Sequence, residues 1–168
     1  GRVLALSDPG YPCYRNFALL VDAEILTLPV SAQAGYQIVP DQIVALKTCP
    51  DMLILCNPSN PTGSIYQEET IAGLHEALSS RDGILVVDEI YGGLTYGRTL
   101  QTALHLGDDI VVVNGFSKTH AMTGWRLGYL IFPKRFTAVM QRIHQNFMIS
   151  ANAFIQWAGI AALTRSRK

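Results

Sequence analysis

The stretch Ile84-Leu85-Val86-Val87-Asp88-Glu89-Ile90-Tyr91 decides the fold that this sequence predicts. Its first four residues are apolar with no polar residue between them, which is typical of a short strand buried on both faces. Two acidic residues, an isoleucine and a tyrosine follow, at the point where such a strand would end. A strand covered on both faces needs a layer above and a layer below, so the stretch indicates a layered α/β domain.

Similar apolar runs recur along the chain, and amphipathic stretches separate several of them. The other runs are Val3–Leu6, Met52–Cys56, Ile110–Val113 and Tyr129–Phe132. One helical face is formed after Glu68-Glu69 by Ile71, Leu74 and Leu78, and a second by Phe136, Val139, Met140, Ile143 and Phe147. Strands that alternate with helices predict a three-layer α/β/α fold with a mostly parallel sheet, in one unit covering residues 1–168.

Composition narrows the class of partner. Of the 168 residues, 49% are apolar and 15% are charged, and 13 basic residues balance 13 acidic ones. This balance predicts no nucleic-acid partner and no anionic membrane surface, so we expect a small-molecule partner. No apolar run approaches the roughly 20 residues that span a bilayer. Cys13, Cys49 and Cys56 show neither disulfide-type nor metal-type spacing, which favours a reduced, cytoplasmic location and no metal site.

Polar and turn-forming residues follow four of the expected strands. They are Ser7-Asp8-Pro9-Gly10-Tyr11, Asn57-Pro58-Ser59-Asn60-Pro61-Thr62-Gly63, Asp88-Glu89-Ile90-Tyr91 and Asn114-Gly115-Phe116-Ser117-Lys118. The carboxyl ends of parallel strands meet at one edge of a sheet, which is where open α/β folds bind ligands. The sequence therefore predicts one functional site at this edge.

Three charged residues near that edge could have catalytic or ligand-binding roles, or could be ordinary solvated surface charges. Taken alone, Lys118 would more often be a solvated surface lysine than a nucleophile. It lies among Gly115, Phe116, Met122 and Trp125, however, where an ammonium group is poorly solvated, and this would favour a nucleophilic role. Asp88 follows a buried strand and should need a cationic partner, because an unpaired carboxylate is costly to bury. The planar fork of Arg126 suits a phosphate dianion, although a surface charge is the simpler interpretation.

Taken together, the motifs resemble a known family. The order Asn57-Pro58-Ser59-Asn60-Pro61-Thr62-Gly63, then Asp88-Glu89-Ile90-Tyr91, then Ser117-Lys118 with Met122-Thr123-Gly124-Trp125-Arg126-Leu127-Gly128 is similar to that of class I/II aminotransferases. These are pyridoxal-phosphate-dependent enzymes of fold-type I. The resemblance covers nearly the whole chain and implies the central, large-domain part of such an enzyme.

The resemblance implies catalytic roles for Lys118, Asp88 and Tyr91. Lys118 would carry pyridoxal 5'-phosphate as a Schiff base and would then move a proton between the substrate Cα and the cofactor. Asp88 would pair with the pyridine nitrogen and keep it protonated. Tyr91 would donate a hydrogen bond to the phenolic oxygen of the ring. The implied reaction transfers an amino group between an α-amino acid and a 2-oxo acid.

Three further residues are implied to bind the cofactor. Asn60 would share the phenolic oxygen, Tyr11 would stack on the ring face and Arg126 would hold the phosphate. The family also implies cis peptide bonds at Asp8–Pro9 and Asn60–Pro61. One departure is Gly115, because many relatives have a phosphate-binding serine at this position, three residues before the lysine. Among the histidines, which otherwise suggest structural roles, His120 is the strongest candidate for a functional one.

Parts of the family pattern lie outside this sequence. We expect a segment of a longer chain without the N-terminal segment and the C-terminal small domain, whose arginine holds the substrate carboxylate in relatives. The family implies a homodimer for the intact protein. The stretch between Arg142 and Arg165 has no arginine or lysine to recognise a dicarboxylate, which disfavours an enzyme restricted to aspartate.

Three alternatives remain open from the sequence. The same scaffold supports elimination chemistry, such as cleavage of a carbon–sulfur bond. Some transcription regulators carry an aminotransferase-like sensor domain, but no basic DNA-binding segment is visible here and such regulators tend to have Asp-Asp-Tyr at the Asp88 motif. A fragment that binds the cofactor without turnover, or that does nothing, is the third.

Overall fold

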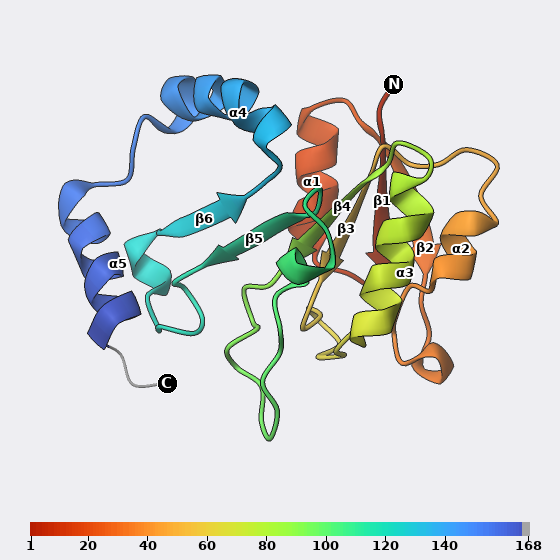
Figure 1. Cartoon of the computed structure of the whole chain (residues 1–168), viewed down its shortest axis with the longest axis horizontal. Coiled ribbons are helices and arrows are strands. Elements are labelled where there is room, and N and C mark those ends of the chain that lie inside the picture. The colour runs from red at the N-terminus through yellow and green to blue at the C-terminus, as the bar shows by residue number, and fades with distance from the viewer. Residues whose placement is uncertain (166–168) are drawn as a thin grey trace.

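The computed structural model of the protein describes residues 1–165, which are built around one six-stranded sheet (Figure 1). The strands are β1 (Val3–Asp8), β2 (Glu24–Pro29), β3 (Met52–Cys56), β4 (Ile84–Asp88), β5 (Val111–Gly115) and β6 (Gly128–Ile131). Their order across the sheet is β2-β1-β3-β4-β5-β6. The first five are parallel, and β6 is antiparallel to β5. The predicted mostly parallel sheet is confirmed.

Helices cover both faces of the sheet. On one face, α2 (Pro40–Val44) and α3 (Glu68–Ser79) pack on the sheet. The strand residues in this core include Ala5 of β1, Leu53 of β3 and Leu85 of β4. On the other face, α1 (Pro12–Leu20) packs through Ala18 on Leu4 and Leu6. Neighbouring residues of one strand thus enter two separate cores, which explains why the runs have no polar alternation.

The predicted helix after Glu68-Glu69 is α3, whose apolar face lies in the main core. Leu74 and Leu78 are fully buried there, and Ile71 is 5% exposed. Each such side chain stabilises the fold by about 1.5–3 kcal/mol through burial. The layer that positions the strand ends is therefore firmly fixed.

Two expectations about strands were wrong. No strand was expected at Glu24–Pro29, where β2 forms one edge of the sheet and begins and ends with exposed residues. The last strand was expected to be buried on both faces, whereas all four residues of β6 are exposed. Both strands lie at sheet edges, where apolar periodicity says little about what covers them.

The C-terminal part of the described chain is helical. It contains α4 (Thr137–Ile143), a π-helical turn at His144–Met148 and α5 (Ala153–Arg165), and both α-helices lie beyond β6 (Figure 1). The helical pattern predicted from Phe136 to Phe147 is confirmed as α4 and the π-turn. Gly159 of α5 is buried against Leu127 and Phe116. Within residues 1–165 no helix is long and apolar enough to cross a lipid bilayer.

Candidate functional site

The carboxyl ends of the parallel strands meet at one edge, and backbone hydrogen bonds tie the segments that leave them together. The amide of Asn57, after β3, donates to the carbonyl of Asp88 at 2.8 Å, and the amide of Glu89, after β4, donates to the carbonyl of Val113 at 2.8 Å. The antiparallel strand β6 starts at this same edge, because Gly128 pairs with Gly115. All six predicted site residues lie in the segments at this edge.

Asp88 is held from two sides at the end of β4. The Tyr14 hydroxyl donates to Asp88 Oδ2 at 2.6 Å, and the Ile90 amide donates to Oδ1 at 3.0 Å. Burial, followed by the charge of Asp88, raises the pKa of Tyr14 well above its usual range, so the phenol remains a donor. Among the described residues Asp88 thus has a phenol and an amide as partners, and the cationic partner expected from the sequence is not one of them.

Tyr14 was missed by the sequence analysis. It lies on the first turn of α1, three residues after Tyr11, and the two rings meet edge to face with centroids 5.2 Å apart. A pair of tyrosines at helical spacing beside the predicted site was the available signal, because residues three apart share a helix face. The two rings connect the predicted ring-stacking position to the half-buried Asp88 carboxylate.

Lys118, Tyr91 and Asn60 form a second group. The Lys118 Nζ lies 5.5 Å from the centroid of the Tyr91 ring, within the range of a cation–π contact. Asn60 Nδ2 donates to the Tyr91 hydroxyl at 3.4 Å. Residues from three separate strand ends therefore meet as the motif order predicted.

Tyr11 adjoins the first group through its ring contact with Tyr14. Interaction with the Cys13 side chain, followed by burial, raises the pKa of Tyr11, and Tyr91 and Asp88 add smaller effects in the same direction. Tyr11 is 37% exposed and therefore accessible to a ligand.

Arg126 does not join these contacts among the described residues. It has a left-handed backbone with φ 55°, its side chain is exposed, and its guanidinium donates to the carbonyl of Thr123 at 2.9 Å. The Thr123 hydroxyl in turn donates to the carbonyl of Ser117 at 2.8 Å. Arg126 is therefore linked to the Lys118 segment through Thr123, and its guanidinium remains at the surface of the edge.

A cleft opens beside Asn60 and Tyr91. It encloses about 580 Å³ and is lined by Pro58, Ser59, Asn60, Pro61, Gly63, Ile65, Tyr91, Leu94, Thr95 and Tyr96. None of these lining residues carries a charge. Two residues predicted to bind the ring therefore line a space large enough for a small molecule.

The comparisons with known proteins identify the family. The model of the family described as aminotransferase class I and II matches residues 1–168. The chain belongs to this family. A valine–pyruvate aminotransferase of Mycobacterium tuberculosis is 34% identical over 98% of this chain and 43% of the relative. A bifunctional aspartate and glutamate/aspartate-prephenate aminotransferase of Petunia hybrida is 36% identical over 97% of this chain and 35% of the relative.

Solved structures of aminotransferases share the fold. The crystal structure of an aminotransferase from Mycobacterium tuberculosis superimposes with a TM-score of 0.93 at 34% identity, over 98% of this chain and 43% of that protein. The aspartate aminotransferase of Thermus thermophilus with maleate gives a TM-score of 0.91 at 28% identity, over 98% and 44%. The chain thus spans less than half the length of these aminotransferases.

The departure from the family pattern at Gly115 has a steric cause. A Cβ atom at this position would lie 3.0 Å from the carbonyl oxygen of Leu127 and 3.1 Å from the Cα of Gly128. Here β5 and β6 approach closely, so a side chain at this position would require the neighbouring backbone to shift by a few tenths of an ångström. The expected cis bonds at Asp8–Pro9 and Asn60–Pro61 are confirmed, and Asn57–Pro58 is also cis.

His120 differs from the other histidines that have partners. The rings of His75 and His105 contact Asp109 at 2.6 Å and Glu68 at 2.8 Å. His120 packs against Phe116, with ring centroids 5.2 Å apart, and its buried Nδ1 has no hydrogen-bond partner within residues 1–165. A functional role for His120 stays a prediction.

Proposed function

We propose that this chain is the pyridoxal-phosphate-binding part of an aminotransferase that transfers an amino group between an α-amino acid and a 2-oxo acid. The observation that carries the proposal is the position of the Lys118 amine by the Tyr91 ring, whose hydroxyl accepts from Asn60, on the edge where Tyr14 holds the Asp88 carboxylate. An amine and a fixed carboxylate on one edge are the two groups that this chemistry needs from the protein. Membership of the family supports the same reaction.

The residues present fit pyridoxal phosphate. Asp88, whose two oxygens are oriented by neutral donors, would face the ring nitrogen, and Asn60 and Tyr91 beside the cleft would bind the phenolic oxygen. The exposed ring of Tyr11 would cover one face of the cofactor. The free donors of Arg126 would hold the phosphate.

When bound, pyridoxal phosphate withdraws the electron pair that is left when the substrate Cα–H bond breaks. Lys118 would be the nucleophile that attaches the cofactor and the base that takes the proton from Cα. Asp88 would hold a proton on the ring nitrogen by its negative charge, and Tyr14 would keep that carboxylate in place. Tyr91 orients the lysine amine by lying beneath it.

The intact protein would work as a cytoplasmic homodimer. Large apolar side chains on the helices beyond β6 support a partner surface, because Phe147 is 82% exposed and Trp157 71%. The three free cysteines support a reducing compartment. The comparisons give the elimination alternative no support, since the relatives found are named as aminotransferases.

The test is attachment of the cofactor to one lysine in the intact protein. Incubation with pyridoxal phosphate, reduction with borohydride and peptide mapping should place the cofactor on Lys118. In Lys118→Ala that label should be lost, with Lys47→Ala as the control that keeps it. Labelling spread over several lysines in both variants would reject the proposal. Amino transfer to 2-oxoglutarate or pyruvate, measured against release of ammonia or sulfide, then separates transfer from elimination.

A further inference from the structure

We propose that Glu89 is a positioning residue for Lys118, because its carboxylate closes the 92–103 loop that packs against the lysine segment. This inference rests on the proposed function. Glu89 has no role in the motif resemblance, and it directly follows Asp88 at the end of β4.

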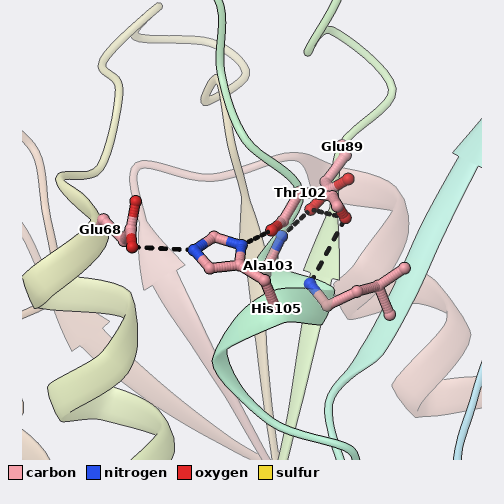
Figure 2. A network of polar contacts seen from close by, with 6 residues as sticks. Glu68, Glu89, Thr102, Ala103 and His105 are labelled. Atoms are coloured by element: carbon pink, nitrogen blue, oxygen red, sulfur yellow. Dashed lines mark hydrogen bonds and ion pairs between the residues drawn. The ribbon is translucent and has the colours of Figure 1, made fainter.

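Glu89 binds both ends of the loop, and Figure 2 shows the contacts of its side chain with the far end, at Thr102 and Ala103. Glu89 Oε1 accepts hydrogen bonds from the Thr102 hydroxyl at 3.1 Å and from the Ala103 amide at 2.6 Å. At the near end, the carbonyl of Glu89 accepts from the Gly92 amide at 2.8 Å. One residue therefore fixes the start and the end of the same loop.

The Glu89 carboxylate is not a solvated surface charge. Burial raises its pKa, and the donors Ala103 and Thr102 act in the opposite direction. A partly buried carboxylate is costly unless donors satisfy it, so the loop must keep these two donors in place. The loop end is thereby tied to the strand end that carries Asp88.

The loop lies directly against the segment of the predicted nucleophile. A Cβ atom at Gly93 would lie 2.4 Å from Cγ2 of Thr119, so the loop backbone and Thr119 are in tight contact. Thr119 follows Lys118 in the chain. Just before the loop, Tyr91 lies 5.5 Å from the lysine amine. A loop that moves would shift both contacts of the Lys118 segment.

The same loop forms one wall of the cleft. Leu94, Thr95 and Tyr96 line it together with residues of the segment that follows β3. If the far end of the loop were released, this wall would move together with the support of Lys118. Glu89 thus acts on the site through the loop, without touching the cleft itself.

The network continues to an exposed pair that serves as a control. His105 Nε2 contacts Glu68 Oε1 on α3 at 2.8 Å, and His105 Nδ1 contacts the Thr102 carbonyl (Figure 2). The side chains of His105 and Glu68 are 42% and 54% exposed. Exposed ion pairs contribute little, so loss of the Glu68 carboxylate should leave the loop in place.

The experiment compares four variants of the intact protein. Glu89→Ala removes the acceptor, Glu89→Gln keeps an oxygen acceptor without the charge, Thr102→Val removes one donor, and Glu68→Gln is the control. The first readout is the affinity for pyridoxal phosphate, with the rate of its attachment to Lys118. The second is hydrogen exchange of residues 92–103 in the cofactor-free protein.

We expect Glu89→Ala to weaken cofactor binding and slow attachment about tenfold, and to speed amide exchange in the loop. Thr102→Val should weaken cofactor binding and slow attachment about threefold. Glu89→Gln should restore binding to within about threefold of the wild type, and Glu68→Gln should match it. If Glu89→Ala does not fold, the inference is tested by Thr102→Val alone, and wild-type attachment in that variant would contradict it.

Three outcomes overturn the inference. They are wild-type attachment in Glu89→Ala, equal losses in Glu68→Gln and Glu89→Ala, and no rescue by Glu89→Gln. The failure of the proposed function looks different, because the unmodified protein would then not attach the cofactor to Lys118 at all.

Discussion

The strands β1 and β3–β5 together with helix α3 form one apolar region, and the segment from β6 to α5 forms another, yet only the first region is buried. Leu53 and Leu74 in the first region are fully buried, whereas Phe147 and Trp157 in the second are 82% and 71% exposed. The strands of the first region have helices on both faces. The second region consists of the last strand, β6, and the helices that follow it (Figure 1). The spacing of apolar residues therefore identifies a face that could be buried. It does not identify the element or partner that buries it.

The largest effect should come from the buried region. Leu74→Ala in α3 should lower the free energy of unfolding by about 2–5 kcal/mol, because the side chain is fully enclosed and leaves a cavity. Denaturant unfolding of the variant measures this loss. A loss below about 1 kcal/mol would mean that the main core is loosely packed.

The boundary between the two regions is the pairing of β5 with β6. Gly115→Ser should cost about 1–3 kcal/mol, because its Cβ would press on the Leu127 carbonyl and the Gly128 backbone. Gly124→Ser is the matched control, since a Cβ there has no neighbour within 4 Å. Equal unfolding midpoints for both variants would contradict the steric account of the departure from the family.

An effect of similar size is expected at a polar contact that joins α1 to β4. Tyr14→Phe should lower stability by about 1.5–3 kcal/mol at most, because Asp88 loses a hydrogen bond to a charged group. Burial raises the pKa of Tyr14, so the folded form keeps the proton above pH 10, where the unfolded chain releases it. Wild-type stability should therefore fall with rising pH above about 10, and the variant should lose less over that range. Unfolding curves at pH 8 and at about pH 10.5 test both statements.

The smallest effect should lie in the exposed region. Phe147→Ala should change the free energy of unfolding of this chain by about 0.5 kcal/mol or less, because the ring is mostly in solvent. In the intact homodimer that we propose, the same change should weaken association, which analytical ultracentrifugation would measure. An unchanged dimer would show that another surface joins the subunits.

Much of the arrangement was readable from residues. The buried strands and α3 follow from apolar runs and helical spacing, and the motifs place Lys118, Asn60 and Tyr91 in one group. The sequence did not reveal β2 or the exposure of β6. Whether a strand lies at the edge of a sheet depends on which elements pack beside it, and the residues of the strand itself do not show this. The sequence also did not reveal Tyr14 as the partner of Asp88, since motif spacing orders segments along the chain and leaves side-chain pairing across the sheet undetermined.

The chain between β5 and β6 is closed at its base. Gly115 pairs with Gly128, and the Phe116 amide donates to the Leu127 carbonyl at 3.1 Å. Lys118 therefore lies on a loop whose two ends are held together by the antiparallel pairing of β5 and β6. The backbone of the loop is fixed at its ends, and the four methylene groups of the lysine side chain allow the amine to move. A residue inserted between 116 and 127 would lengthen this loop while the strand register stays the same. That makes the loop a place to adjust the reach of the amine relative to Asp88.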